Sequence, residues 1–173
     1  ETEKEYFNEF KLDLGEIKLV TIRSNCTPKK MVYEAIKMKK EKEYRQIWCV
    51  FDKDEFKDFD EAIFLADKNE IEVAYSNQAF ELWFIMHFER IIAPLNRNRY
   101  KEYINKYLRI AEHYDYDKPY RGIYKKISQK TEKAIENAKF GHQTHKSNGG
   151  KPSDWESCTT VYRLVSELRK WKK

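Results

Sequence analysis

The sequence predicts an α/β protein with a mainly parallel sheet flanked by helices, followed by a C-terminal helical extension. Two short runs, at residues 47–51 and 70–75, are rich in the β-branched and aromatic residues typical of strands. Helical patterns lie before, between and after them, and alternating strands and helices favour a parallel sheet. The run IWCVF at residues 47–51 is apolar in every position, which is typical of a strand covered on both faces.

The first half of the chain contains one further predicted strand and four predicted helices. Apolar and polar residues alternate sufficiently over residues 16–23 (EIKLVTIR) to predict a strand after Gly15. The helices have apolar residues at helical spacing, and Ser76 and Asn77 are predicted to cap the last of them. These helices are expected over residues 1–12, 29–44, 59–68 and 78–90.

The second half, after Pro94, is helical, basic and rich in tyrosine. Helices are predicted over residues 98–112, 119–140 and 158–171, and a mobile loop over residues 140–152, where glycine and polar residues gather. We therefore expect residues 1–92 to form the α/β core and residues 93–173 to form an extension that packs on it as one compact unit.

Composition limits the class of protein. A chain of 173 residues fits one domain, and 40% hydrophobic and 15% aromatic residues argue against disorder. No run of 18 apolar residues occurs, so we expect a cytoplasmic protein that does not enter a membrane. Its three cysteines are widely spaced, which favours reduced thiols.

Charge is divided unevenly along the chain. Residues 1–90 carry 15 Lys and Arg against 20 Asp and Glu, whereas residues 91–173 carry 19 against 9. The acidic half suits a cation site, and the basic half suits a polyanion such as DNA or RNA. Charged helix faces in a lysine-rich protein are the simpler explanation for part of this imbalance.

The strongest candidate for chemistry is the acidic turn that follows residues 47–51. Asp52 and Asp54 are two residues apart, so in an extended segment their carboxylates point the same way. Hard divalent cations such as Mg²⁺ or Mn²⁺ prefer oxygen ligands and relieve the repulsion between such carboxylates. The alternative is a solvated turn whose acids favour the start of the next helix.

A second candidate is Glu81, which lies within the apolar segment SNQAFELWFIMHF. A carboxylate in such a helix is costly unless it is paired, hydrogen-bonded or bound to a metal. The alternative is a glutamate that reaches solvent or an arginine. His87, in the same segment, is interpreted as a hydrogen-bonded core residue.

Cations and tyrosines interleave in the basic half, a pattern that suits phosphate contact and base stacking. Tyr100 is one of these tyrosines, although tyrosines at helical spacing are more often core residues. The predicted nucleic-acid contacts are Arg97, Arg99, Lys118, Arg121, Lys125 and Lys151.

Four segments, in order, give the chain a resemblance to a known family. They are TEKEYF at residues 2–7, VFDKDEF at 50–56, SNQAFELWFIMHF at 76–88, and YDK at 116–118 with the helices behind it. Together they resemble the motifs of the RloB family, Toprim-like proteins encoded in prokaryotic defence loci. The first acid of the family's opening motif has no counterpart here, so we expect the strand that carries it to be missing ahead of residue 1.

The resemblance implies a Toprim-like fold and a magnesium-dependent nuclease that works beside a partner ATPase in anti-phage abortive infection. It makes Glu3, Asp52 and Asp54 the metal ligands, with Glu81 and Lys118 as further catalytic residues. Ser76 and Asn77 fall on the third motif as structural support for the site.

Two other functions stay open from the sequence. A non-catalytic module could bind nucleic acid or an ATPase through the basic half, and a phosphatase or nucleotide-processing enzyme could use the same acids. The target, whether DNA or RNA such as transfer RNA, and any homo-oligomer are left open.

Overall fold

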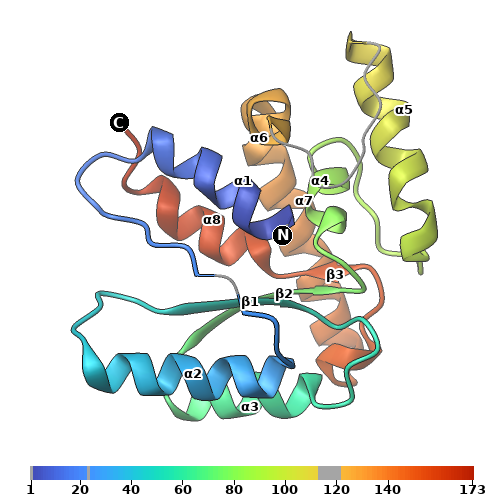
Figure 1. The fold of residues 1–173 in the computed structure, drawn as a ribbon. Coiled ribbons are helices and arrows are strands. Elements are labelled where there is room, and N and C mark those ends of the chain that lie inside the picture. The colour runs from blue at the N-terminus through green and yellow to red at the C-terminus, as the bar shows by residue number, and fades with distance from the viewer. Residues whose placement is uncertain (1, 23, 113–121) are drawn as a thin grey trace.

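The protein is described by a computed structural model, in which residues 2–22, 24–112 and 122–173 are placed. A three-stranded sheet lies between two layers of helices (Figure 1). The strands are β1 (Trp48–Asp52), β2 (Glu72–Asn77) and β3 (Cys158–Thr159), in that order across the sheet. β1 and β2 are parallel, as predicted, whereas β3 runs antiparallel to β2. The sheet is therefore small and mixed, and the mainly parallel Toprim-like sheet is not confirmed.

Alternate residues of the strands face two separate apolar clusters. Cys49 and Phe51 of β1 pack with α2 (Pro28–Glu41) and α3 (Phe59–Lys68) on one face. Val50 of β1 and Ala74 of β2 pack in the larger cluster on the other face. Since side chains alternate along a strand, burial on both faces explains why the run at residues 47–51 lacks polar residues.

The larger cluster is built from helices at both ends of the chain. α1 (Thr2–Phe10) continues into a short 3-10 helix, η1 (Lys11–Asp13), and contributes Tyr6, Phe7 and Phe10 to the cluster. α8 (Val161–Arg169) lies near α1 in Figure 1 and contributes Val161, Leu164, Val165 and Leu168. The predicted packing of the terminal helix on the core is thereby confirmed.

The helix α4 (Glu81–Met86) has all six of its residues buried. It is shorter than the helix predicted over residues 78–90, and Ser76 and Asn77, which were predicted to cap it, belong to β2. Asn77 pairs with Cys158 of β3. Residues that the local sequence favours as helix caps therefore form a strand instead, with a partner strand from late in the chain.

Three further predictions about the chain path were wrong. Residues 16–22 form no strand, and Leu14 makes only an isolated bridge with Lys172. The region around residues 119–140 divides into α6 (Ile123–Ile127), η3 (Ser128–Lys130) and α7 (Thr131–Asn148). α7 occupies most of the predicted loop at residues 140–152, and residues 149–151 separate it from the 3-10 helix η4 (Pro152–Asp154).

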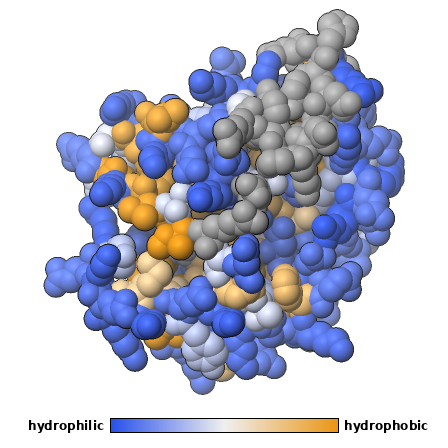
Figure 2. All heavy atoms as spheres, in the orientation of Figure 1, coloured by the Kyte–Doolittle hydropathy of each residue, from blue (hydrophilic) through white to orange (hydrophobic). Residues whose placement is uncertain are grey.

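Three more helices complete the described part of the chain. α5 (Tyr100–Glu112) follows the 3-10 helix η2 (Arg97–Arg99), and η4 (Pro152–Asp154) precedes β3. The visible face in Figure 2 is mostly hydrophilic, with the largest group of apolar residues on its left side and smaller ones below the centre. Among the exposed apolar side chains are Leu12, Val20 and Ile22, which are 67%, 55% and 62% exposed. None of the helices in the described segments has the length and apolar character required to cross a membrane.

His87 is fully buried and, as predicted, is a hydrogen-bonded core residue, since its Nδ1 lies 2.9 Å from the carbonyl oxygen of Trp83. Burial lowers the pKa of His87 to about 4. The unfolded chain takes up this proton near pH 6.5, whereas the folded protein does so only near pH 4. The contribution of His87 to stability is therefore complete above pH 6.5 and is lost as pH falls toward 4.

We expect this linkage to cost about 3 kcal/mol of unfolding free energy between pH 6.5 and 4. Urea unfolding of the wild type and of His87→Leu across this range measures it. The difference between the two free energies should be constant above pH 6.5 and should change by about 3 kcal/mol below it. A difference independent of pH would show that His87 does not resist protonation in the folded protein.

Candidate functional site

A polar cleft lies at the carboxyl edge of the parallel strands, with a volume of about 290 Å³. We call it the edge cleft. In open α/β sheets, ligands bind in this position, where strands end and loops begin. The residues that line it come from the ends of β1 and β2 and from two later loops: Lys53, Asp54, Glu55, Asn77, Gln78, Asn96, Arg97, Asn98, Ser153 and Glu156.

Asp52 and Asp54 stand at the end of β1 but in different backbone settings. Asp52 is the last residue of the strand and lies opposite Ser76 of β2. Asp54 is in the turn beyond it, with φ +39°, and its carboxylate forms an ion pair with Arg97. The strand alternation from which we predicted parallel carboxylates therefore stops at Asp52, because Asp54 is no longer in extended backbone.

Glu81 is 2% exposed, and the hydroxyl of Thr2 donates a hydrogen bond of 3.3 Å to its Oε1. This contact joins the first turn of α1 to the first turn of α4, two elements that are 79 residues apart in the chain. Glu3 is the next residue of α1, and its place in a shared site with Glu81 stays a prediction.

Tyr100 connects Asp52 and Glu81 electrostatically, which the sequence did not indicate. Burial, with smaller contributions from the negative charges of Asp52 and Glu81, raises the pKa of Tyr100 to about 12, against a hydrogen bond with the backbone of Gln78 that lowers it. Both carboxylates thus act on one buried phenol at the start of α5. Sequence reasoning grouped Tyr100 with base-stacking tyrosines, because helical spacing cannot reveal which carboxylates a tyrosine will meet.

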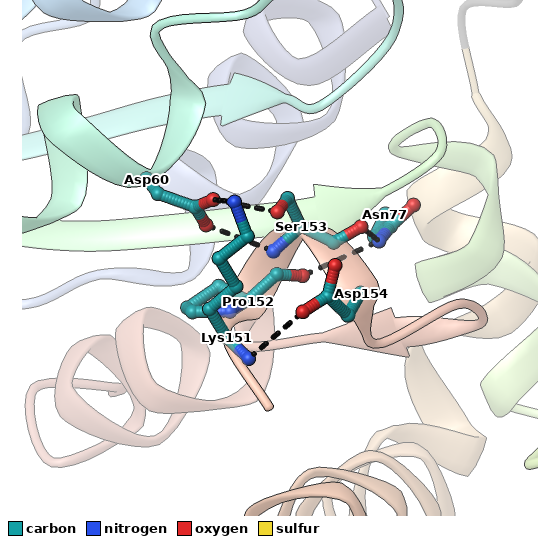
Figure 3. A network of polar contacts seen from close by, with 6 residues as sticks. All are labelled: Asp60, Asn77, Lys151, Pro152, Ser153 and Asp154. Atoms are coloured by element: carbon teal, nitrogen blue, oxygen red, sulfur yellow. Dashed lines mark hydrogen bonds and ion pairs between the residues drawn. The ribbon is translucent and has the colours of Figure 1, made fainter. Parts of the chain in front are cut away.

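The turn that precedes β3 is held against the sheet by two polar side chains (Figure 3). Asp60 of α3 accepts hydrogen bonds from the backbone N–H of Ser153, at 2.9 Å, and from its hydroxyl, at 2.5 Å. Asn77 donates to the carbonyl oxygens of Pro152 and Ser153, at 3.3 and 3.1 Å. Ser153 reaches the edge cleft from this turn, so Asp60 and Asn77 position part of the cleft wall.

Ser76, the other residue predicted to support the site, is fully buried within the sheet. Its hydroxyl lies 2.9 Å from that of Thr159 in β3, and the two residues are opposite each other in the strand register. The bond joins β2 to β3 at the same edge that carries the acids.

The predicted nucleic-acid contacts are spread over several elements. Arg97 pairs with Asp54, Arg99 lies 3.4 Å from the carboxylate of Glu102, and Lys151 lies 3.2 Å from that of Asp60. Lys125 is exposed on α6. Lys118 and Arg121 lie outside the described residues. Of the four predicted cations that the structure describes, only Arg97 lines the edge cleft.

The carboxylate oxygens at this edge are the hard ligands that Mg²⁺ prefers. Their arrangement, however, is not that of a complete metal site. Within residues 2–22, 24–112 and 122–173, no group of three or more His, Cys, Asp or Glu side chains is placed to hold a metal ion. The carboxylate oxygens are thus the kind of ligand that suits the cation implied by the resemblance. That Glu3, Asp52 and Asp54 gather around one cation stays a prediction.

Comparison with known proteins identifies a family. The model of the family described as RloB-like protein matches residues 1–168. No curated protein matches the chain, and no solved structure matches it.

Proposed function

Because this chain belongs to the RloB-like protein family, we propose that it is a metal-dependent nuclease that cleaves DNA or RNA at the edge cleft. The observation that carries the proposal is the position of Asp52 and Asp54 at the carboxyl end of β1, with Glu81 and Asp52 both acting on Tyr100. Acids brought from separate parts of the chain to one sheet edge are typical of a site for phosphodiester chemistry.

In this proposal each group has a distinct role. Asp52, Asp54 and Glu3 bind Mg²⁺ or Mn²⁺, and Glu81 supports them. The bound cation supplies charge stabilisation for the phosphoryl oxygens and lowers the pKa of water. Arg97 and Lys53 offer positive charge to the substrate phosphate in the cleft, and Lys118 adds stabilisation to the transition state.

By family membership we further propose a role in anti-phage defence, as an effector controlled by an ATPase partner. A nuclease that attacks cellular nucleic acid must be restrained until it is needed. The basic second half of the chain offers a surface for either polyanion or partner.

A second candidate function is favoured by the ion pair between Asp54 and Arg97. A carboxylate that is already neutralised by a guanidinium has less need of a cation. Together with the lack of a group of three metal-binding side chains among the described residues, this pair suits a non-catalytic module that binds nucleic acid or the ATPase.

Removal of divalent metal separates the two functions. We expect the purified protein to cleave labelled DNA, RNA or transfer RNA in Mg²⁺ or Mn²⁺ and to lose all cleavage in EDTA. Binding, measured by fluorescence anisotropy in EDTA, should weaken steeply with salt in either case. Binding without cleavage of any of these substrates, in either metal, would reject the nuclease and support the module.

A further inference from the structure

Two carboxamide side chains in the wall of the edge cleft are held in a fixed orientation. The Oε1 atom of Gln78 accepts a hydrogen bond from the backbone N–H of Arg97, at 3.0 Å. The Oδ1 atom of Asn96 accepts one from the backbone N–H of Asn98, at 2.9 Å. Because a backbone N–H can only donate, the oxygen of each amide faces the turn at residues 96–98. Each side chain therefore offers its NH2 group, a donor, to a ligand in the cleft.

The two anchored amides lie at one turn, close to the end of β1. The N–H groups that hold them belong to consecutive residues of the chain. The backbone carbonyl of Gln78 also accepts a hydrogen bond from the N–H of Asp54, at 3.3 Å, which joins this turn to the acidic turn after β1. Within the described part of the chain, neither NH2 group has a hydrogen-bond partner. Two donors are therefore left for a ligand beside the proposed metal ligands.

The rest of the cleft lining suits a nucleobase better than a second phosphate. Amide and carboxylate side chains read the edges of bases by hydrogen bonds. Besides the amides, the cleft has the carboxylates of Glu55 and Glu156, which repel a phosphate but accept hydrogen bonds from the N–H groups of a base. Its volume of about 290 Å³ is close to that of the smallest ligand pockets, about 300 Å³, so it suits one unpaired nucleotide and not a duplex.

Guanine is the base whose edge fits this set of groups. Its O6 and N7 atoms are neighbouring acceptors that suit the two amide donors, and its N2 amino group is a donor that suits a carboxylate. Adenine offers N7 as an acceptor but N6 as a donor, and an amide that reads both uses its oxygen. Since the oxygens of Gln78 and Asn96 already accept backbone hydrogen bonds, adenine is the poorer ligand.

We propose that Gln78 and Asn96 form a base-reading subsite, which binds an unpaired guanine of single-stranded DNA or RNA next to the bond that is cut. The inference rests on the proposed nuclease function, which brings nucleic acid to the edge cleft. It identifies the substrate as a single strand, either free or in a loop, and makes these two residues determinants of specificity. They bind the base and take no part in breaking the bond.

Fluorescence anisotropy in EDTA tests the subsite without depending on cleavage. The probes are labelled all-thymine DNA strands and all-uracil RNA strands, each with one central G, A or C or without a substitution. We expect the full chain to bind the G strand of at least one of the two series about 10-fold more tightly than the other strands. A complementary strand should remove this difference, because a paired base cannot enter the cleft.

Gln78→Glu and Asn96→Asp are the informative variants, since each keeps the oxygen that accepts the backbone hydrogen bond and removes the NH2 donor. Each should reduce the preference for G to about threefold or less. The control is Gln46→Glu, before the start of β1, which adds the same charge and keeps its hydrogen bond from Trp48 Nε1, at 3.1 Å. The control should bind every strand slightly more weakly and keep the full preference for G.

Loss of the preference in the two variants but not in the control would support the proposal. Equal affinity for all strands, a preference for another base, or a preference for G that survives in both variants would overturn it. These ratios do not depend on catalysis. If the wild type cleaves no nucleic acid in Mg²⁺ or Mn²⁺, the nuclease function fails, while the ratios still decide whether the subsite reads guanine.

Discussion

Replacement of Asp52 by asparagine is expected to slow cleavage by at least about 100-fold. The substitution keeps the size and position of the side chain at the end of β1 but removes the negative charge that would hold a cation or accept a proton. Single-turnover cleavage of a labelled oligonucleotide in Mg²⁺ measures the effect. Binding in EDTA should stay within about twofold, because the loss concerns the reaction and not the basic surface.

The matched control for this variant is Asp67→Asn, an exposed acid on α3. It changes net charge equally and should cleave at the wild-type rate. If Asp52→Asn cleaved as fast as Asp67→Asn, then Asp52 would have no part in the chemistry. The nuclease would then need a site elsewhere in the chain.

Replacement of Glu81 by glutamine is expected to lower cleavage by about 10- to 100-fold without lowering stability. The side chain is 2% exposed, and glutamine can still accept the hydrogen bond from Thr2 through its Oε1. A neutral amide is less costly to bury than a carboxylate. A buried acid kept at the expense of stability is typical of a functional site.

Cleavage assays and urea unfolding on the same preparation separate a functional from a structural Glu81. The control is Glu61→Gln, which removes a surface carboxylate that pairs with Lys29. That pair is exposed, so its loss should change neither the cleavage rate nor the free energy of unfolding by much. A Glu81→Gln protein that unfolds more easily than wild type and cleaves normally would make Glu81 a structural residue.

The pair between Asp54 and Arg97 relates the two candidate functions to each other. Its side chains are 43% and 41% exposed, and exposed ion pairs contribute only about 0–1 kcal/mol. A cation can therefore displace Arg97 from Asp54 at little cost, and a phosphate can displace Asp54 from Arg97. The same two residues thus suit either metal-assisted cleavage or simple binding of a polyanion.

Much of the fold could be predicted because its signals are local. The apolar run at β1, the amphipathic patterns of α2, α3 and α8, and the burial of His87 each follow from residues close together in the chain. β3 could not be predicted in the same way. It has only two residues, and its pairing with Ser76 and Asn77 depends on contacts about 80 residues away.

The candidate site was predicted in its residue types but not in its geometry. Spacing identified Asp52 and Asp54, and the apolar residues around Glu81 identified it as a candidate. The positive φ of Asp54 and its pair with Arg97 come from the turn and from a loop 43 residues later. Asp60, which holds the wall of the cleft through Ser153, gave no signal beyond that of a helix-starting acid.

By itself, the sequence determined β1, β2 and most of the helices, the apolar faces of those elements, and which acids are candidates for chemistry. These properties depend on neighbours within a few residues, where backbone periodicity controls exposure. The tertiary structure alone decided that Thr2 meets Glu81, that Asn77 holds the turn before β3, and that Asp60 of α3 holds Ser153. Such contacts join residues from distant parts of the chain, and their partners are set by the packing of whole elements, which no local pattern records.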